Sequence, residues 1–503
     1  MRSEGTGGAG AADEDAGERR RRWQALSVCL LAAFMTLLDI SIVNVALPSI
    51  REGLHASEGQ LQWILSGYAL MFGLVLVPAG RLGDARGRRA VFMAGMALFT
   101  LSSFAAGLAP AMPWLIFARL VQGTAGGIIN PQILGLIQQL FTGAERGRAF
   151  GALGTTIGLA MAVGPLLGGA LIALGGQEHG WRWIFYVNVP VGLAALPLAW
   201  RLLPPPVPAD RRRRESLDPV GVVLLGLGVV AIMLPFLQER QWHGPLKWAL
   251  LPAGAAVLAA WVAWERRHPS PLADVRLFRF RSYALGSSIG LLYFAGFTAI
   301  FFIFTLYLQN GLDYSALEAG LAITPFALGS AVSAAAGGRL VSRWGRHLVA
   351  AGLVVVLAGI GTAWLAVELH PGRGVAWYIA APLLLAGVGS GFVISPNQTI
   401  TLSQVPPGEG GSAGGVLQTG QRIGTACGIA AVGATFFAAV ANSGGDWALA
   451  FRHGLVVILV FVLLALGAAV ADLTAGRRRS RVTGSGGSGG TAPARAGPPR
   501  SPR

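Results

Sequence analysis

The sequence predicts an all-α, multi-pass membrane protein built from two six-helix halves with two further helices between them. Of its 503 residues, 53% are hydrophobic and only 12% are charged, whereas soluble globular proteins carry about 25% charged residues. A spanning helix needs about 20 apolar residues, and fourteen such runs follow one another along the chain. We expect them at 24–48, 61–80, 90–109, 112–138, 149–173, 184–203, 219–237, 247–265, 283–308, 316–338, 347–368, 376–401, 412–439 and 452–473.

Arginine-rich connections alternate with nearly bare ones, and this alternation predicts the orientation. The rich connections are 19–22, 81–89, 146–148, 201–214, 266–281, 339–346 and 477–481. Such connections face the cytoplasm, so both ends of the chain are expected inside, which requires an even number of helices. The connection 402–411 has no Arg, and its placement rests on parity alone. Because the positive charges lie between apolar runs, they do not indicate a nucleic-acid-binding module.

The two halves of the chain contain a short internal repeat. GRLGDARGRR at 80–89 is similar to GRLVSRWGRH at 338–347, and GGIINPQ at 126–132 is similar to GFVISPN at 391–397. Repeated halves with a site at their interface are a transporter architecture, in which rocking one half against the other gives alternating access. The expected division is a disordered cytoplasmic tail at 1–22, the first half at 23–203, a cytoplasmic linker at 204–218, two inserted helices at 219–265, a second cytoplasmic linker at 266–282, the second half at 283–473 and a disordered basic tail at 474–503.

Asp39 is the only acidic residue deep within an apolar run, here the run at 23–48. A carboxylate at that depth costs at least ~2.5–3.5 kcal/mol, so it usually faces a bundle interior or a wet pathway. Burial disfavours the charged form of a carboxyl group and lets it exchange a proton near neutral pH. We interpret Asp39 as a proton carrier; a structural carboxylate paired to Arg or to the backbone is the alternative.

Asp39 stands in LDISIVNVALP at 38–48, and Arg119 stands in RLVQG at 119–123. Together with GRLGDARGRR at 80–89 and the glycine-rich fifth helix, these motifs resemble, in order, the Major Facilitator Superfamily, specifically its 14-helix drug:proton antiporter branch (EmrB/QacA type), over residues 24–473. The resemblance implies that the acidic residue of the first helix takes part in proton coupling and that the Arg of the fourth helix assists proton transfer. At 1.5 Å per residue, Asp39 and Arg119 lie at similar depths, roughly 15 and 10 Å from the outer ends of their helices. An Arg held by carbonyl groups for packing is the alternative.

The connection after the second helix resembles the superfamily's charged loop between helices 2 and 3. Its motif residues are Gly80, Arg81, Gly83, Asp84, Gly87 and Arg88. In the family this loop latches the inward gate, so Asp84 is expected to pair with an Arg of a neighbouring helix end. Ala85 departs from the pattern, because a basic residue is common there, and Ser342 replaces the Asp in the second half, where a weaker latch is expected. A tight cytoplasmic turn with topology charges is the alternative.

The fifth helix resembles the glycine-rich signature associated with antiporters as opposed to symporters. The residues that carry this resemblance are Gly158, Gly164, Pro165, Gly168 and Gly169. Small residues let helices approach closely, and Pro permits a bend. The following segment, WRWIFYVNVPVG at 181–192, is also typical of the branch, and we expect it to form an interfacial aromatic belt.

Four aromatic residues at helical spacing form a candidate wall of the substrate cavity. They are Tyr293, Phe297, Phe301 and Phe304, in the ninth helix. An aromatic stripe of this kind is also typical of simple packing, so both interpretations stay open. Arg422, near the middle of the thirteenth helix, needs a partner; Asp39, a substrate anion and a cluster of carbonyl groups are the candidates.

These features predict a proton-coupled antiporter that exports small amphipathic compounds, such as drugs, biocides or secondary metabolites, by alternating access. The resemblance implies a multi-pass protein of a bacterial cell membrane that works as a monomer, with protons as coupling ion and neither a cofactor nor a metal. The expected partners are a small-molecule substrate and the lipid bilayer. A dedicated metabolite exporter or exchanger, or an importer, is the alternative, although the antiporter-type fifth helix argues against import. An enzyme is not expected, because the sequence contains no HExxH, GxSxG or P-loop motif.

Overall fold

The computed structural model describes residues 7–176, 178–205, 218–238, 242 and 244–485. Their regular structure is entirely helical. The first half comprises α1 (Gly7–Leu54), α2 (Glu58–Arg86), α3 (Arg88–Gly107), α4 (Met112–Leu140), α5 (Gly143–Gly175) and a sixth span divided into α6 (Trp181–Tyr186) and α7 (Asn188–Leu202). The inserted pair is α8 (Pro219–Leu237) and α9 (Leu250–Glu265). The second half comprises α10 (Arg281–Leu306), α11 (Ala316–Trp344), α12 (Arg346–Leu369), α13 (Val375–Thr401), α14 (Gly410–Asn442) and α15 (Trp447–Ser485). The predicted fold class is confirmed.

The described residues include thirteen helices that are long and apolar enough to cross a membrane. The helix α4 is not among them, because it carries Arg119 together with several amide side chains. Arg119, Gln122 and Gln132 are all buried, so these polar groups face other helices and not lipid. The chain is therefore a multi-pass membrane protein whose fourth span carries buried polar side chains.

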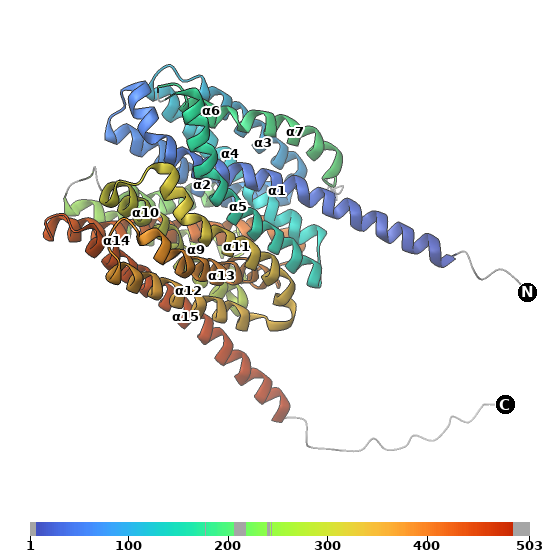
Figure 1. Cartoon of the computed structure of the whole chain (residues 1–503). Helices are drawn as coiled ribbons and strands as arrows, with labels where there is room; N and C mark the ends of the chain where they lie inside the picture. The colour runs from blue at the N-terminus through green and yellow to red at the C-terminus, as the bar shows by residue number, and fades with distance from the viewer. Residues whose placement is uncertain (1–6, 177, 206–217, 239–241, 243, 486–503) are drawn as a thin grey trace, which may run out of the picture.

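The terminal helices extend beyond the expected spans. The helix α1 begins at Gly7 and α15 continues to Ser485, so parts of both predicted tails are helical. In α1 the extension is tied to the bundle, because Arg19 forms a 3.0 Å ion pair with Glu145 of α5. Both outer ends project from the same end of the bundle (Figure 1), which we call the terminal end. The predicted tails at 1–6 and 486–503, and the linker Arg residues 211–214, lie outside the described residues.

One apolar cluster lies within the second half, whereas the main cluster of the first half also includes residues of the second half such as Leu402 and Leu417. The halves meet chiefly along two helix pairs, α5 with α11 and α2 with α14. Glycines allow both approaches. A Cβ atom on Gly80 of α2 would lie 2.3 Å from the carbonyl oxygen of Gly411 in α14, and one on Gly158 of α5 would lie 2.9 Å from the backbone nitrogen of Ala331 in α11. Because these are backbone contacts, a larger residue at either glycine would force the helices apart.

The inserted helices α8 and α9 pair with each other, and α8 packs against both α2 and α14. Met233 of α8 is buried, and its sulfur would lie 3.4 Å from a Cβ atom at Gly73 of α2. The insert thus covers the seam between the two halves on the α2–α14 side, a role that we did not predict.

Candidate functional site

The Asp39 carboxylate is completely buried and accepts three hydrogen bonds from side chains of two other helices. Its Oδ2 accepts from Arg119 Nη1 at 2.6 Å, and its Oδ1 accepts from Gln122 Nε2 at 2.9 Å and from Asn188 Nδ2 at 3.0 Å. Arg119 and Gln122 belong to α4, and Asn188 begins α7. We call these four side chains the carboxylate cage. The structure therefore brings together the two residues expected to couple protons.

Arg119 is held in place from several sides, with a side chain that is 1% exposed. Besides Asp39, its Nη1 donates to Gln122 Oε1 at 2.7 Å. Its guanidinium carbon lies 4.2 Å from the centre of the Tyr68 ring, which belongs to α2, and 5.8 Å from that of Phe185. Such cation–π contacts strengthen when water is excluded. The cage thus links α1, α2, α4 and the divided sixth span at one point within the first half.

Sequence reasoning missed Asn188, the member of the carboxylate cage that belongs to the sixth span. Asn188 lies in the segment 181–192, for which we expected an aromatic belt, and its Nδ2 also donates to Ser103 Oγ of α3 at 3.1 Å. The signal was present, because an Asn inside an apolar run needs a buried partner. The belt itself is only partial, since Trp183 is exposed whereas Trp181 and Phe185 are buried.

The charged loop between α2 and α3 joins the two halves at the terminal end of the bundle. Asp84 Oδ1 accepts from Arg88 Nη2 at 2.6 Å, so its Arg partner belongs to the same motif and starts the next helix. The carboxylate also accepts from the backbone nitrogens of Gly411 and Ser412, at 3.0 and 2.8 Å. These amides open α14, and a helix N-terminus favours negative charge. Asp84 therefore closes a contact between the two halves.

Other members of this motif shape the turn and extend the contact. Gly87 has a φ of 99°, which only glycine adopts readily. Arg88 donates to the carbonyl oxygens of Gly135 in α4, at 2.7 Å, and of Pro407 in the second half, at 2.5 Å. Gly83 leaves room for the buried amide of Gln132, and the half-buried Arg81 lies on the last turns of α2 together with Gly80.

The matching loop of the second half has no Asp at the position of Asp84, and its Arg pairs instead with an Asp of α15. Among the described residues, Ser342 bonds only the backbone oxygen of Arg339 in its own helix. Arg346, which occupies the place of Arg88 in the repeat, lies 2.5 Å from Asp472 of α15 and donates to Asn397 Oδ1 at 2.6 Å. A charge contact thus exists here too, but Arg346 forms it within the second half.

The glycine-rich face of α5 packs against two different helices. Cβ atoms on Gly164 and Gly168 would meet Ser41 and Ile42 of α1, next to Asp39, at 2.4 and 2.9 Å. Gly158 faces α11 of the other half, and Pro165 lies beside Gly320 of the same helix. Gly169 has no atom within 4 Å of such a position. The helix α5 therefore connects the α1 helix, which carries Asp39, to the second half.

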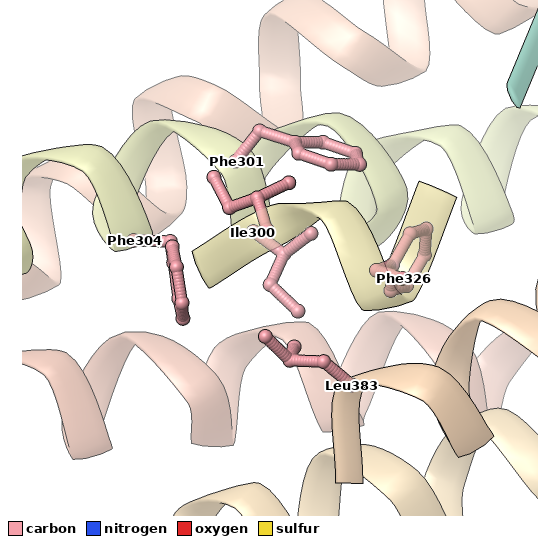
Figure 2. Close-up of a pocket in the computed structure, with 6 residues that line it drawn as sticks. Ile300, Phe301, Phe304, Phe326 and Leu383 are labelled. Carbon is pink, nitrogen blue, oxygen red and sulfur yellow. The ribbon is translucent and has the colours of Figure 1, made fainter. Parts of the chain in front are cut away.

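The aromatic stripe of α10 belongs largely to the core of the second half. Tyr293, Phe297 and Phe304 are buried there, and Phe301 is partly buried. Figure 2 shows a small pocket between α10, α11 and α13. It has a volume of about 10 Å³ and is lined by Ile300, Phe301, Phe304, Ile323, Phe326 and Leu383. That is about the least space that holds one water molecule, so the pocket is far smaller than a drug-sized ligand.

Arg422 points from α14 toward α2 of the first half. Its guanidinium carbon lies 4.3 Å from the centre of the Phe72 ring. Among the described residues, Arg422 forms neither an ion pair nor a hydrogen bond, so the structure pairs it with none of the protein groups that we considered. The Phe72 ring stacks in turn on Tyr68, which also contacts Arg119 of the cage.

Comparison with known proteins agrees with this architecture. The family model of the Major Facilitator Superfamily matches residues 29–429. The chain belongs to the Major Facilitator Superfamily. Its members are membrane transporters, so the predicted family is confirmed.

Two curated relatives match most of the chain, and a solved structure shares its fold. It is 37% identical to the probable actinorhodin transporter of Streptomyces coelicolor over 424 residues, which are 83% of this chain and 73% of the relative. It is also 37% identical to the puromycin resistance protein pur8 of Streptomyces alboniger, over 82% of this chain and 81% of the relative. The solved proton:xylose symporter XylE superposes with a TM-score of 0.63 at 15% identity, covering 89% of this chain and 95% of that one. At that identity the likeness shows the fold alone.

Proposed function

We propose that this superfamily member is a proton-coupled antiporter that exports small amphipathic compounds by alternating access. The observation that carries the proposal is the carboxylate cage, a fully buried Asp39 within 2.6 Å of Arg119. An ionisable residue inside a membrane bundle is by default a functional candidate. Export is supported by the names of the relatives, which include a probable actinorhodin transporter and a puromycin resistance protein.

The surroundings of Asp39 in the carboxylate cage have opposing effects on whether its carboxylate binds a proton. Burial disfavours the charged form of Asp39, whereas Arg119 and the amide donors of Gln122 and Asn188 favour it. The helix α5 packs against α1 beside Asp39 and against α11 of the other half. Rocking of the halves would therefore shift α1 relative to α4 and change the distance between Asp39 and Arg119. Separation of the pair would let Asp39 bind a proton, and closure would expel it.

The contact of Asp84 with the first turn of α14 is the second part of the proposed transport cycle, because it closes one side of the protein. In this structure the halves are joined at the terminal end, which we assign to the cytoplasm together with both chain termini. Release of Asp84 from the first turn of α14 would open a path to the cytoplasm. Substrate and proton would then occupy the protein alternately, each bound from one side and released to the other, in a single monomer.

A resistance screen tests the proposal. Wild type, Asp39→Asn and Asp446→Asn are expressed at matched membrane levels in an efflux-deficient bacterial host, and growth is scored against antibiotics, dyes and biocides, with puromycin included. Asp446 is an exposed helix cap on α15, and Asn caps helices as well as Asp, so this variant is the matched control. We expect resistance in wild type and the control, and its loss in Asp39→Asn. Normal resistance in Asp39→Asn would refute the coupling role.

A dedicated exporter of one metabolite is the second candidate, because the names of several relatives each refer to a single antibiotic. The same screen separates the two. Resistance to a range of unrelated compounds supports a multidrug exporter, whereas resistance to one chemical family, or to none of the panel, supports the dedicated exporter.

A further inference from the structure

Arg422 is an intramembrane cation for which the described part of the chain offers no counterion. It lies twelve residues after Gly410, the first residue of α14, hence about 18 Å along that helix from the terminal end. Its guanidinium stacks on Phe72, and its Cβ lies 3.8 Å from the place of a Cβ on Gly73, so it sits at the seam between the halves. An Arg keeps its charge even when it is buried, and a charge at this depth is costly unless it is paired.

The carboxylate cage does not neutralise Arg422. Asp39 already accepts from Arg119, Gln122 and Asn188 and is enclosed by them. Arg119 lies over the Tyr68 ring and Arg422 over the Phe72 ring that stacks on it, so among the described residues one carboxylate and two guanidiniums leave a net charge of +1 around these two rings. In this conformation the seam therefore carries an excess positive charge that an external anion would balance.

The groups beside Arg422 are suited to an acid attached to an apolar body. Tyr68 stacks on Phe72, with ring centres 6.0 Å apart, and its hydroxyl is buried without a hydrogen-bond partner among the described residues. The ring of Phe72 and the side chain of Met233 supply apolar surface. A cation with a spare polar group and apolar walls is typical of a ligand site.

We propose that Arg422 anchors the acid group of an organic anion, a carboxylate or phenolate with an apolar body, at the seam between α2 and α14. The guanidinium supplies charge-assisted hydrogen bonds, which are about twice as strong as neutral ones. The Tyr68 hydroxyl is the second donor. This inference rests on the proposed function, because it names the substrate class of the exporter.

The test is a binding measurement on the purified full-length protein in lipid nanodiscs at pH 7.5, without a proton gradient. The probes are 2-naphthoate and 2-naphthamide, which share one apolar body and differ in charge, and binding is followed by the change in tryptophan fluorescence. Wild type is expected to bind the naphthoate about tenfold or more tightly than the amide, the size of one hydrogen bond to a charged group. Equal affinity for both probes, or no saturable binding of naphthoate, would overturn the proposal.

Variants test whether Arg422 causes the preference for naphthoate over naphthamide. Arg422→Gln is expected to lose the preference for the anion, whereas Arg422→Lys retains part of it. Arg373→Gln, at an exposed loop position, is the charge-matched control and is expected to bind as wild type does. If Arg422→Gln fails to fold, Tyr68→Phe replaces it, because it removes one hydroxyl and should weaken binding of naphthoate more than of the amide. An unchanged preference in Arg422→Gln, or in Tyr68→Phe where that variant replaces it, contradicts the site. Because no gradient is applied, this result is independent of whether Asp39 couples protons.

Discussion

Replacement of Asn188 by Leu tests the carboxylate cage at a residue that carries no charge. Its amide donates one hydrogen bond to Asp39 Oδ1 at 3.0 Å, and Leu has a similar volume but no donor. A hydrogen bond to a charged group contributes about 1.5–3 kcal/mol. That bond helps to hold the Asp39 carboxylate beside Arg119, so its loss should slow proton-coupled export. Because about 1.4 kcal/mol corresponds to a factor of ten, the initial rate of export should fall about tenfold or more.

The assay is the initial rate of substrate export from proteoliposomes at matched protein levels, with a substrate found in the resistance screen. Asn130→Leu is the matched control, because among the described residues the Asn130 amide bonds only the carbonyl oxygen of Gly126 in its own helix, at 3.0 Å. The control is expected to keep the wild-type rate. An Asn188→Leu rate equal to that of wild type would refute the reasoning.

Two further predictions concern the seam between the halves. Gly158→Ala would place a Cβ 2.9 Å from the backbone nitrogen of Ala331, so export should slow, whereas Gly169→Ala, with open space around it, should export normally; equal rates at matched membrane levels would contradict the close approach. Asp84→Asn removes the charge that the first turn of α14 binds, a change of about 1–3 kcal/mol, so hydrogen exchange of the amides at 411–414 should accelerate about tenfold or more. Unchanged exchange there would show that the gate does not depend on this carboxylate.

Contacts that follow from helix geometry could be predicted from the sequence. The rise per residue put Asp39 and Arg119 at similar depths, and the structure places them 2.6 Å apart. Likewise Asp84 and Arg88 are four residues apart, so their pairing is local. The count of fourteen spans followed from the apolar runs and from the alternation of Arg-rich connections.

Contacts that depend on helix rotation and on distant packing could not be predicted. Asn188 reaches Asp39 only because the sixth span turns that residue inward, which periodicity in an almost wholly apolar segment does not specify. Arg346 forms its ion pair with Asp472, which lies on a helix distant in the sequence. The sequence around Ser342 gives no sign of that partner, so it predicts a weaker contact. The aromatic stripe of α10 is the reverse case, because its spacing fits a cavity wall and a packed core equally well, and most of it lies in the core.

The central claim is that Asp39 exchanges a proton against substrate, and proton movement tests it most directly. Purified wild type and Asp39→Asn are compared in proteoliposomes that contain a pH-sensitive dye, and substrate is added on one side without an imposed gradient. The account predicts that wild type moves protons opposite to the substrate, whereas Asp39→Asn still binds substrate but moves no protons. Substrate-driven proton movement of wild-type size in Asp39→Asn would contradict the account.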